Sequence, residues 1–265
     1  MSKLYVENKQ VAVPGELLAE GMDYLPSNGA YRKDEQILAN RVGLVSINGR
    51  AIKLIPLSGP YMPKRDDMVI CHVTDIMMSG WRLDVNCANQ AMLNMRDATN
   101  SFIQKGANLS RILQIGDYMV GKVVNVTSQK LIDITMKGPG LKKLGDGQIV
   151  KFSATKFPRM IGRSGSMVSM IKQATGCYIQ VGQNGLIWLS GDVDKEVIAI
   201  EAINLIEENA HTSGLTDRVK VFLESKGLKV EERNREQDSQ QDSQQESNQD
   251  FQQPDFQQEN QDGEQ

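Results

Sequence analysis

Hydrophobic and polar positions in the first quarter of the chain follow a strand pattern. Residues 1–62 contain short runs of β-forming residues separated by turn signals. In "LVSINGRAIKLIPL" the pair Asn48-Gly49 lies between two such runs, and Asn-Gly supplies the two positive φ angles of a type I′ hairpin turn. The pattern is then interrupted at Pro56, Pro60 and Pro63. We therefore expect a small N-terminal β domain over residues 1–62.

Residues 63–137 carry the pattern of a small closed barrel. Five short strands are predicted between Asp67 and Met136, over "DMVICHVTDI", "GWRLDV", "QAMLNM", "DYMVGKVVNV" and "LIDITM". Five short strands with glycine between them suit the OB fold. The stretch "MKGPGLKKLGDG" follows, and its glycines predict a linker over residues 138–148.

Residues 149–228 change to a mixed α and β pattern. A strand in "IVKFSA" precedes a helix in "MVSMIKQAT", a hairpin around "GQNG", and the amphipathic helix "DVDKEVIAIEAINLIEENA". A final helix is predicted in "TDRVKVFLESKG". The predicted order is β, α, α, β, β, α with one further helix. The fold class is thus multidomain, all-β followed by α+β.

The last residues differ from the rest in charge and composition. Residues 231–265 hold eleven acidic and two basic residues, a net charge of −9, and are otherwise rich in Gln, Asn and Ser. Such a segment cannot bury enough apolar surface to offset its ordering entropy, so residues 229–265 are predicted to be a disordered acidic Gln-rich tail. The whole chain has a charge of −3, which leaves −3 − (−9) = +6 on residues 1–230. A mildly cationic body suits a polyanionic partner.

Several classes of protein are disfavoured by what the sequence lacks. No apolar run approaches the roughly 20 residues of a membrane span, and the N-terminus has no signal-peptide core, so a cytoplasmic location without a membrane partner is expected. The three cysteines and two histidines are widely spaced, so we expect no metal site and no cofactor. No nucleophile elbow or phosphate-binding loop is complete, and no catalytic residue is assigned.

The motif that carries chemistry is Gly162-Arg163-Ser164-Gly165, between two predicted helices. The glycines allow a backbone to approach a bulky ligand, the following helix offers free N–H groups to a phosphate, and Arg163 adds a cationic donor. In a βααββα frame this is the GxxG loop of a type I KH domain, which clamps about four single-stranded nucleotides. Outside that frame, GxxG is an ordinary helix–helix turn. The neighbouring apolar residues are expected to line a groove or to be core, namely Ile161, Val168, Ile179 and Val181.

The barrel offers a second, weaker set of candidates. OB-type barrels bind single strands with a basic groove and aromatic rings. The candidate RNA-binding residues of the barrel are Arg82, Arg96, Lys122, Lys137 and Trp81. Scattered cations on strands are more often a solvated face, and aromatic residues are few. An alternative is a metal-dependent ribonuclease that uses a carboxylate set of Asp66, Asp67, Asp75 and Asp84, although Asp is ordinary in turns.

Three consecutive pieces of sequence resemble a known family. An N-terminal domain running into an S1-type barrel is suggested by "VPGELLAEG", "NGAYRKDEQILANRVGLV" and "LIPLSGPYMPKRDDMVICHV". A later strand of that barrel looks like "IGDYMVGKVVNV", and a KH domain looks like "MIGRSGSMVSMIKQATGCYIQVGQNGLIWLSG". Together they resemble the archaeal exosome RNA-binding cap subunit of the ribosomal RNA-processing protein 4 family. The chain departs from the pattern at Asp66-Asp67, where Gly-Asp is usual, and has only Trp81 near the aromatic cluster of generic S1 domains.

The resemblance implies a role that the residues alone do not give. Members are non-catalytic, and three copies, alone or mixed with another cap subunit, are expected on a hexameric ring of RNase-PH-type subunits. The N-terminal domain is expected to dock on the ring and the barrel to face its entry pore, guiding single-stranded RNA 3′ ends to 3′-to-5′ degradation. A free-standing S1/KH RNA-binding protein of translation or RNA metabolism is the other alternative.

Overall fold

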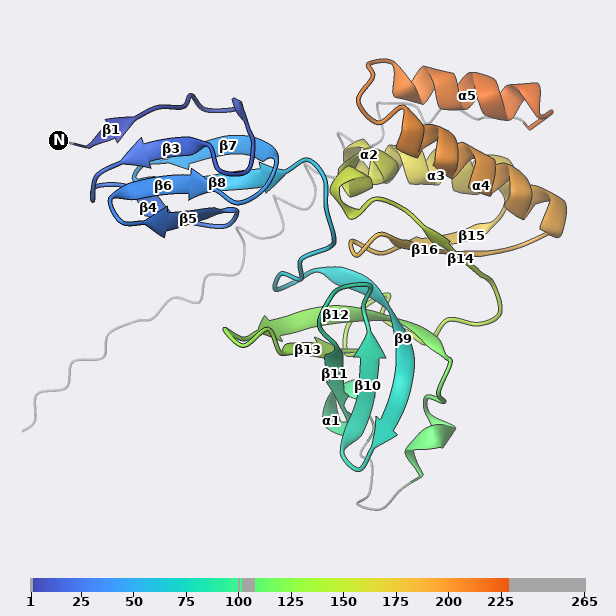
Figure 1. The fold of residues 1–265 in the computed structure, drawn as a ribbon. Helices are drawn as coiled ribbons and strands as arrows, with labels where there is room; N and C mark the ends of the chain where they lie inside the picture. The colour runs from blue at the N-terminus through green and yellow to red at the C-terminus, as the bar shows by residue number, and fades with distance from the viewer. Residues whose placement is uncertain (1, 100, 102–107, 229–265) are drawn as a thin grey trace, which may run out of the picture. The chain divides into compact units, whose positions relative to one another are not determined.

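The computed structural model describes residues 2–99, 101 and 108–228. The predicted tail, residues 229–265, and part of the loop after the third barrel strand lie outside the described residues. Figure 1 shows three groups of elements along the chain: strands β1–β8, the barrel strands β9–β13, and a sheet of β14–β16 with helices. None of the described helices is long and apolar enough to cross a membrane.

The N-terminal domain consists of two four-stranded sheets, ordered β1-β3-β6-β5 and β2-β7-β8-β4. Its strands span Lys3–Leu4, Val11–Ala12, Leu17–Glu20, Leu25–Pro26, Ala30–Lys33, Gln36–Ala39, Gly43–Asn48 and Ala51–Pro56. Alternate residues of these strands point inward, so Leu18, Ile37 and Ile52 are fully buried in the core. The strands are short because turns and prolines end them, as the sequence predicts.

The predicted hairpin of β7 and β8 is present, but its turn differs from the expected one. Asn48 pairs with Ala51, so the two central residues are Gly49 and Arg50, not Asn48 and Gly49. Only Gly49 has a positive φ, at 59°. This is the φ pattern of a type II′ turn, which needs glycine at its first central position alone. The type I′ prediction was therefore wrong by one residue in register.

Residues 68–135 form a closed five-stranded barrel in the order β10-β11-β13-β12-β9. Its strands are Met68–Met77, Gly80–Asp84, Ala91–Asn94, Tyr118–Val126 and Ile132–Thr135, with the short helix α1 at Met95–Ala98 and the 3-10 turn η1 at Leu109–Arg111. β11 and β13 pair in parallel and the other neighbours pair antiparallel. Closure leaves no sheet edge, and the interior is filled by side chains that include Val69, Leu83 and Leu93.

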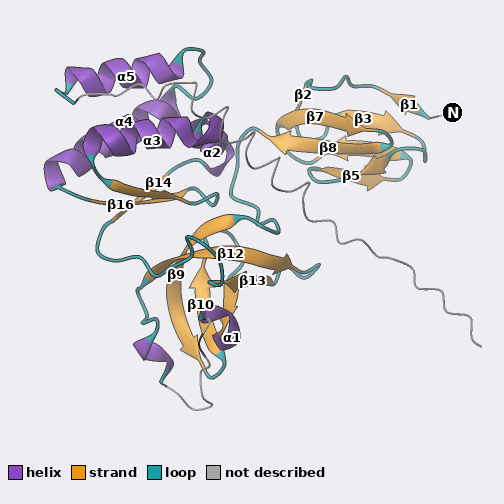
Figure 2. Ribbon diagram, turned by 180° about the vertical axis from the view of Figure 1, so that it is seen from behind, coloured by secondary structure: helices purple, strands orange, loops and turns teal. Residues whose placement is uncertain are grey.

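The third group is a three-stranded sheet, β14-β16-β15, with helices on one face (Figure 2). The strands are Gln148–Lys151, Tyr178–Val181 and Leu186–Ser190, and the helices are α2 at Phe157–Ile161, α3 at Ser166–Thr175, α4 at Val193–Glu208 and α5 at Leu215–Ser225. The short 3-10 turns η2 and η3 lie at Ala154–Lys156 and Arg163–Gly165. The core between sheet and helices contains Met160, Ile171, Ile187 and Ile203. The order β, α, α, β, β, α with an added helix matches the prediction.

One turn of the third group is hydrogen-bonded to the barrel. The Asn184 amide nitrogen donates to the carbonyl oxygens of Ile70 (2.7 Å) and Val85 (3.0 Å), and its Oδ1 accepts from the Ile70 N–H at 3.2 Å. Gln183 exchanges two bonds with Met68: its N–H donates to the Met68 carbonyl at 2.9 Å, and its Oε1 accepts from the Met68 N–H at 2.6 Å. The "GQNG" turn therefore caps the start of β9 with side-chain amides and main chain.

Apolar side chains complete this contact. Ile70 and Val120 of the barrel, Leu144 of the connecting segment and Leu186 of β16 form one buried cluster. The predicted linker is itself bound to the barrel, because the Val120 N–H donates to the Lys142 carbonyl at 2.9 Å and the Leu144 N–H to the Tyr118 carbonyl at 2.8 Å. The expected fold class is confirmed for the described residues, and the barrel and the α+β group are in contact through this cluster and the "GQNG" turn.

Replacement of Asn184 by alanine tests how much this contact contributes to stability. Asn184→Ala leaves three buried main-chain groups at Ile70 and Val85 without partners, which costs about 1–3 kcal/mol for each unsatisfied group. We expect a clear loss of unfolding free energy in urea and faster amide exchange at the start of β9. The matched control is Asn204→Ala on the exposed side of α4, which should change stability by less than about 0.5 kcal/mol. Equal effects of the two substitutions would contradict this account.

Candidate nucleic-acid interface

The Gly162–Gly165 loop joins α2 to α3 in an open, left-handed backbone. Gly162, Ser164 and Gly165 have φ angles of 75°, 47° and 79°. A non-glycine residue such as Ser164 is uncommon in this region of φ/ψ space. The loop thus turns its backbone sharply between the two helices, and Arg163 is exposed on it. The sequence motif is therefore present as a true loop and not as a continuous helix.

The two glycines are needed for different reasons. A Cβ at Gly162 would lie 2.9 Å from both the backbone nitrogen and the Cβ of Met167, so only hydrogen fits there. A Cβ at Gly165 would meet nothing closer than the Ser169 hydroxyl at 4.0 Å, so the constraint at that position is its φ angle and the space is open. The open side of Gly165 is where another backbone could approach.

Helix α3 starts directly at this loop, and no side chain of the described residues caps its N-terminus. Its first N–H groups therefore lack side-chain partners and carry the positive end of the helix dipole, an arrangement that suits a phosphate. The inner face of α3 is core, with Met167, Val168 and Ile171 buried. Among the predicted groove residues, Val168 and Ile179 are buried, whereas Ile161 and Val181 are partly exposed. Most of the side-chain area of these four residues belongs to the core.

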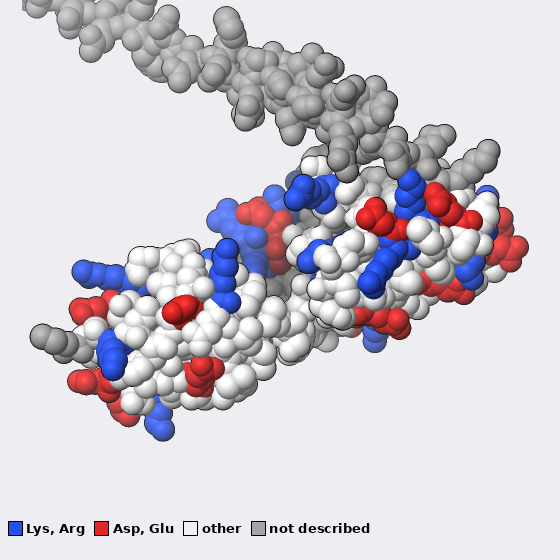
Figure 3. All heavy atoms as spheres, turned by 90° about the horizontal axis from the view of Figure 1, so that it is seen from above, with Lys and Arg blue, Asp and Glu red and all other residues white. Residues whose placement is uncertain are grey.

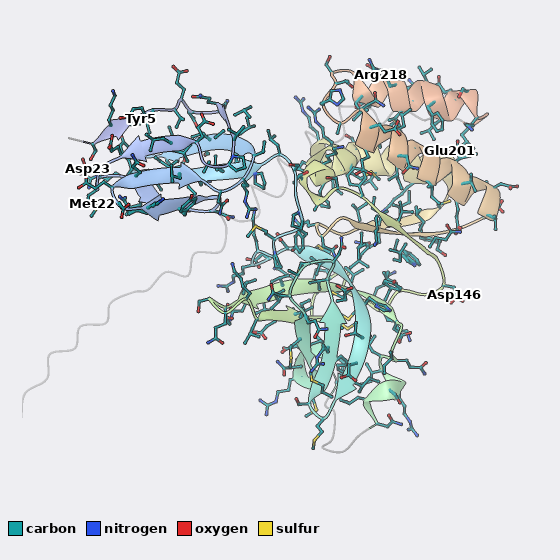
Figure 4. The ribbon with its side chains drawn as sticks, viewed as in Figure 1. Tyr5, Met22, Asp23, Asp146, Glu201 and Arg218 are labelled. Carbon is teal, nitrogen blue, oxygen red and sulfur yellow. The ribbon has the colours of Figure 1, made fainter. Side chains whose placement is uncertain are left out.

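The sequence on both sides of the loop contains no acidic residue. Asp146 and Asp192 are consecutive acidic residues, so residues 147–191 include β14, α2, the loop, α3, β15 and β16 without one acid. The same stretch holds five basic residues, Lys151, Lys156, Arg159, Arg163 and Lys172. Helix α4, by contrast, has five acidic residues and one basic residue. Figure 4 marks Asp146 where the chain enters this stretch and Glu201 on α4.

This segregation of charge identifies residues that the motif search missed. Arg159 lies on α2, four residues before Arg163 of the loop, and both are exposed. Lys172 is in the last turn of α3, where partial burial lowers its pKa. These residues could have been found from the long interval between the consecutive acidic residues Asp146 and Asp192. A search for motifs does not examine such intervals. A strand of RNA that follows α2 and α3 would meet these cations. The carboxylates close to this stretch come from α4, where Glu207 accepts from the Ser153 N–H at 2.9 Å.

Two of the barrel cations are held by acids. The Lys122 Nζ lies 2.8 Å from the Asp66 Oδ1, and this hydrogen bond holds the pKa of the exposed Asp66 carboxyl below its ordinary value. The Arg82 guanidinium lies 3.7 Å from the Asp75 carboxylate. Exposed ion pairs are weak, so Lys122 and Arg82 can exchange partners. The neighbouring carboxylates nevertheless reduce the positive field that these two cations present.

Arg96 and Lys137 are brought near one another at one end of the barrel. The Asp97 carbonyl accepts from the Met136 N–H at 2.8 Å and from the Thr135 hydroxyl at 3.3 Å, which joins α1 to the end of β13. Both cations are exposed and neither forms an ion pair with a described residue. Of the four predicted barrel cations, these two have charge available to a polyanion.

Trp81 is a core residue of the barrel. Its side chain is fully buried, and its indole Nε1 donates to the Leu113 carbonyl at 3.0 Å. A ring without an exposed face cannot stack on a base, so this burial corrects the expectation that Trp81 contacts RNA. The period of β10 explains the result: Trp81 and Leu83 point inward and Arg82 points outward.

The carboxylates of the ribonuclease alternative each have their own structural partner. The Asp67 carboxylate accepts from the Tyr61 hydroxyl at 2.7 Å and the Lys64 N–H at 3.0 Å, and Asp84 accepts from the Asn86 N–H at 2.8 Å. Within the described ranges, no three His, Cys, Asp or Glu side chains gather into a group that could hold a metal ion. Four separately paired aspartates do not form a nucleolytic centre.

An OB-type barrel joined to a βααββα domain with an open GxxG loop defines a protein of the single-stranded nucleic-acid-binding class. A family model described as KH domain matches residues 148–205. Proteins described as exosome complex component Rrp4 are 42% identical in Methanothermobacter thermautotrophicus, over 83% of this chain and 70% of the relative, and 41% identical in Pyrococcus abyssi, over 88% and 89%. The chain belongs to the Rrp4 family of exosome components.

A solved structure agrees with this assignment. A crystal structure of a protein provisionally described as an exosome complex RNA-binding protein is 35% identical, with a TM-score of 0.57. The match covers 63% of this chain and 97% of that one. The Rrp4 relative from Thermococcus kodakarensis is 41% identical, over 88% of this chain and 92% of the relative. The resemblance seen in the sequence is therefore confirmed at the level of the family.

Substitution of Trp81 separates a core role from RNA contact. Trp81→Phe removes the hydrogen bond to the Leu113 carbonyl and leaves a void, so we expect the unfolding free energy to fall by about 1–3 kcal/mol. The RNA dissociation constant of the folded variant should equal that of the wild type, measured by fluorescence anisotropy well below the unfolding temperature. A variant that is fully stable but binds RNA more weakly would restore Trp81 as a contact residue.

Proposed function

We propose that the protein is a non-catalytic RNA-binding cap subunit of a cytoplasmic exosome. It captures single-stranded RNA 3′ ends and guides them into a hexameric, phosphorolytic ring of RNase-PH-type subunits for 3′-to-5′ degradation and processing. The single observation that carries the proposal is Rrp4 family membership at about 40% identity over most of the chain. In this proposal the N-terminal domain ends at residue 62, the barrel at residue 137, the linker at residue 148 and the KH domain at residue 228. No cofactor takes part.

Electrostatics supports RNA as the ligand of the KH domain. The GxxG loop lies within the acid-free stretch of residues 147–191, so a phosphate at the α3 N-terminus meets cations from Arg159 and Arg163 and no sequence-adjacent carboxylate. Gly165 leaves open space for the RNA backbone. In the barrel, Arg96 and Lys137 supply charge that is not neutralised by a described acid, with Arg82 and Lys122 beside paired carboxylates.

Exposed apolar side chains support the N-terminal domain as the part that docks on the ring. Large apolar side chains are exposed on it at Tyr5, Val11, Val13, Met22, Leu25, Tyr31, Ile55 and Leu57. The face seen from above is mostly uncharged over this domain (Figure 3). Tyr5, Met22 and Asp23 lie at one end of it (Figure 4), and the loop that bears Met22 is held by Arg32, which donates to the Gly21 carbonyl at 3.0 Å. Extended apolar exposure is typical of protein-binding surfaces.

Barrel and KH domain would act together on one strand. Their contact through Asn184 fixes one binding element relative to the other, so both can be engaged without an added ordering cost. Three copies, alone or mixed with another cap subunit, would raise the local concentration of weak sites around the pore. Each subunit could then bind RNA modestly while the assembly holds it.

Reconstitution with ring subunits tests the assembly. We expect co-elution at a few hundred kilodaltons and faster degradation of an oligoadenylate-tailed RNA than by the ring alone. A double variant, Met22→Asp with Leu25→Asp, places carboxylates on the apolar docking surface and should weaken ring binding about tenfold or more, because a charge is costly to bury. Val197→Asp with Val221→Asp, at similarly exposed apolar sites on α4 and α5, is the control. No complex and no change in degradation would favour the free-standing RNA binder.

The loop proposal is tested best at Gly165. Gly165→Asp adds a negative charge where a phosphate would lie, and the open space lets the fold survive. We expect RNA affinity to fall about tenfold, since a phosphate contact is replaced by repulsion. Gly214→Asp is the matched control, because Gly214 also has a left-handed φ (68°) and open surroundings but lies at the start of α5. Unchanged affinity in a folded Gly165→Asp protein would make the loop purely structural.

A further inference from the structure

Two of the Asn-Gly pairs in the chain lie at tight turns with opposite surroundings. Asparagine is chemically labile, and a following glycine makes it more so, because no Cβ hinders the approach of the glycine nitrogen to the asparagine Cγ. Asn48-Gly49 lies at the exposed tip of the β7–β8 hairpin. Asn184-Gly185 lies in the turn that caps β9 of the barrel. The same dipeptide is therefore open at one position and enclosed at the other.

The Asn184 side chain is held in a position where it cannot lose its amide. It is fully buried and forms three hydrogen bonds with the main chain of Ile70 and Val85. The Gly185 nitrogen, which would have to attack the Asn184 Cγ, donates its proton to a carbonyl oxygen of the same turn at 3.1 Å. A Cβ at Gly185 would lie 2.2 Å from the Phe152 carbonyl oxygen, so the turn has no space in which to reorient.

Asn48 has none of these restraints. Both Asn48 and Gly49 are exposed, and the Asn48 side chain forms no hydrogen bond with a described residue. A Cβ at Gly49 would meet no atom within 4 Å, so the space around this turn is open. Asn48 therefore provides an internal reference for the reaction of an open Asn-Gly pair in this chain.

We propose that Asn184 is a covalent modification site that is closed while the barrel and the KH domain are joined and that reacts once they separate. In this reaction the Gly185 nitrogen gives up its proton and bonds to the Asn184 Cγ, the Cγ–Nδ2 bond breaks, and ammonia leaves with that proton. Water then opens the resulting ring at either of its two carbonyl carbons, which gives aspartate or isoaspartate. No electrons are transferred, and water is the one co-reactant.

Loss of the amide prevents the two domains from joining again in the same way. The Asn184 Nδ2 donates to the Ile70 and Val85 carbonyls, and a carboxylate oxygen in its place has no proton to donate and repels both. Buried carbonyls without partners destabilise the joined arrangement. An isoaspartate also lengthens the main chain of a turn whose glycines are closely packed. Separation therefore becomes irreversible after one reaction. This inference does not depend on RNA binding or on assembly with a ring.

The experiment measures both sites in the full-length wild-type protein. It is incubated in heavy-oxygen water, natively and in concentrated urea, so that only amides lost during the incubation carry the label, and peptides are quantified by mass spectrometry. In urea we expect Asn48 and Asn184 to react at similar rates, because the local sequence sets them. Natively, Asn184 should react about a hundredfold or more slowly than in urea, since only molecules with separated domains can react. An Asn184 that reacts as fast natively as in urea, or not at all in urea, overturns the proposal.

A barrel variant distinguishes separation of the domains from unfolding of the whole chain. Val120 packs in the apolar cluster between barrel and KH domain, so Val120→Ala should raise the native rate at Asn184 about tenfold and leave Asn48 unchanged. The matched control is Val45→Ala, the same truncation in the core of the N-terminal domain, which should leave the rate at Asn184 unchanged. Equal acceleration of Asn184 by both variants would mean that global unfolding exposes it, contrary to the proposal.

Irreversibility is tested on the modified protein. After partial reaction in urea and refolding, molecules that have lost an amide carry an added negative charge and are separated by ion exchange. We expect fast amide exchange at the start of β9 in the fraction modified at Asn184, as in Asn184→Asp. The fraction modified at Asn48, and Asn48→Asp, should exchange as the wild type does. Wild-type exchange in the fraction modified at Asn184 would show that the domains join again, and irreversibility would be wrong.

Discussion

The hydrogen bonds between the Asn184 side chain and the barrel main chain are the constraint on which the rest of the molecule depends. A single primary amide offers two donors and one acceptor group, and here it satisfies the N–H and carbonyl of Ile70 and the carbonyl of Val85. These groups are buried, so their satisfaction is worth more than a surface contact. Without this cap, the first barrel strand would present open backbone groups at the position where the KH sheet covers it.

Charge is distributed differently over the two binding domains, and this distribution sets what each can contribute. In the barrel, Lys122 and Arg82 have carboxylate partners, so an RNA ligand would have to compete with Asp66 and Asp75 for them. In the KH domain, the stretch around the GxxG loop has no acids, and the carboxylates are concentrated on α4. Under the proposed function, long-range attraction would come from the whole cationic body, whereas the loop geometry and the α3 dipole would orient the strand.

Sequence periodicity predicted the architecture well because each strand or helix buries one face and reports its period directly. The five barrel strands and the βααββα order were recognised this way, and the GxxG loop was recognised from its two glycines within that order. The Trp81 prediction was wrong because its aromatic character was given more weight than the alternation of β10, in which Trp81 and Leu83 point inward and Arg82 points outward. The turn prediction at Asn48-Gly49 was wrong by one residue, because the pairing of Asn48 with Ala51 sets the register. The contacts of Gln183 with Met68 and of Asn184 with Ile70 join residues more than a hundred positions apart, which no local pattern encodes.

The cap at β9 also has an evolutionary consequence. The KH turn forms hydrogen bonds with main-chain groups of the barrel, and every amino acid except proline supplies both of these groups. Residues such as Met68 and Val85 can therefore be substituted without breaking these hydrogen bonds. The turn has no such freedom: Asn184 must keep its amide, and a Cβ at Gly182 would lie 2.9 Å from the Ile70 nitrogen. Selection on these hydrogen bonds therefore falls almost entirely on the turn. Grafting the same turn onto an unrelated barrel would require a matched backbone, with apolar side chains in the places of Ile70 and Val120.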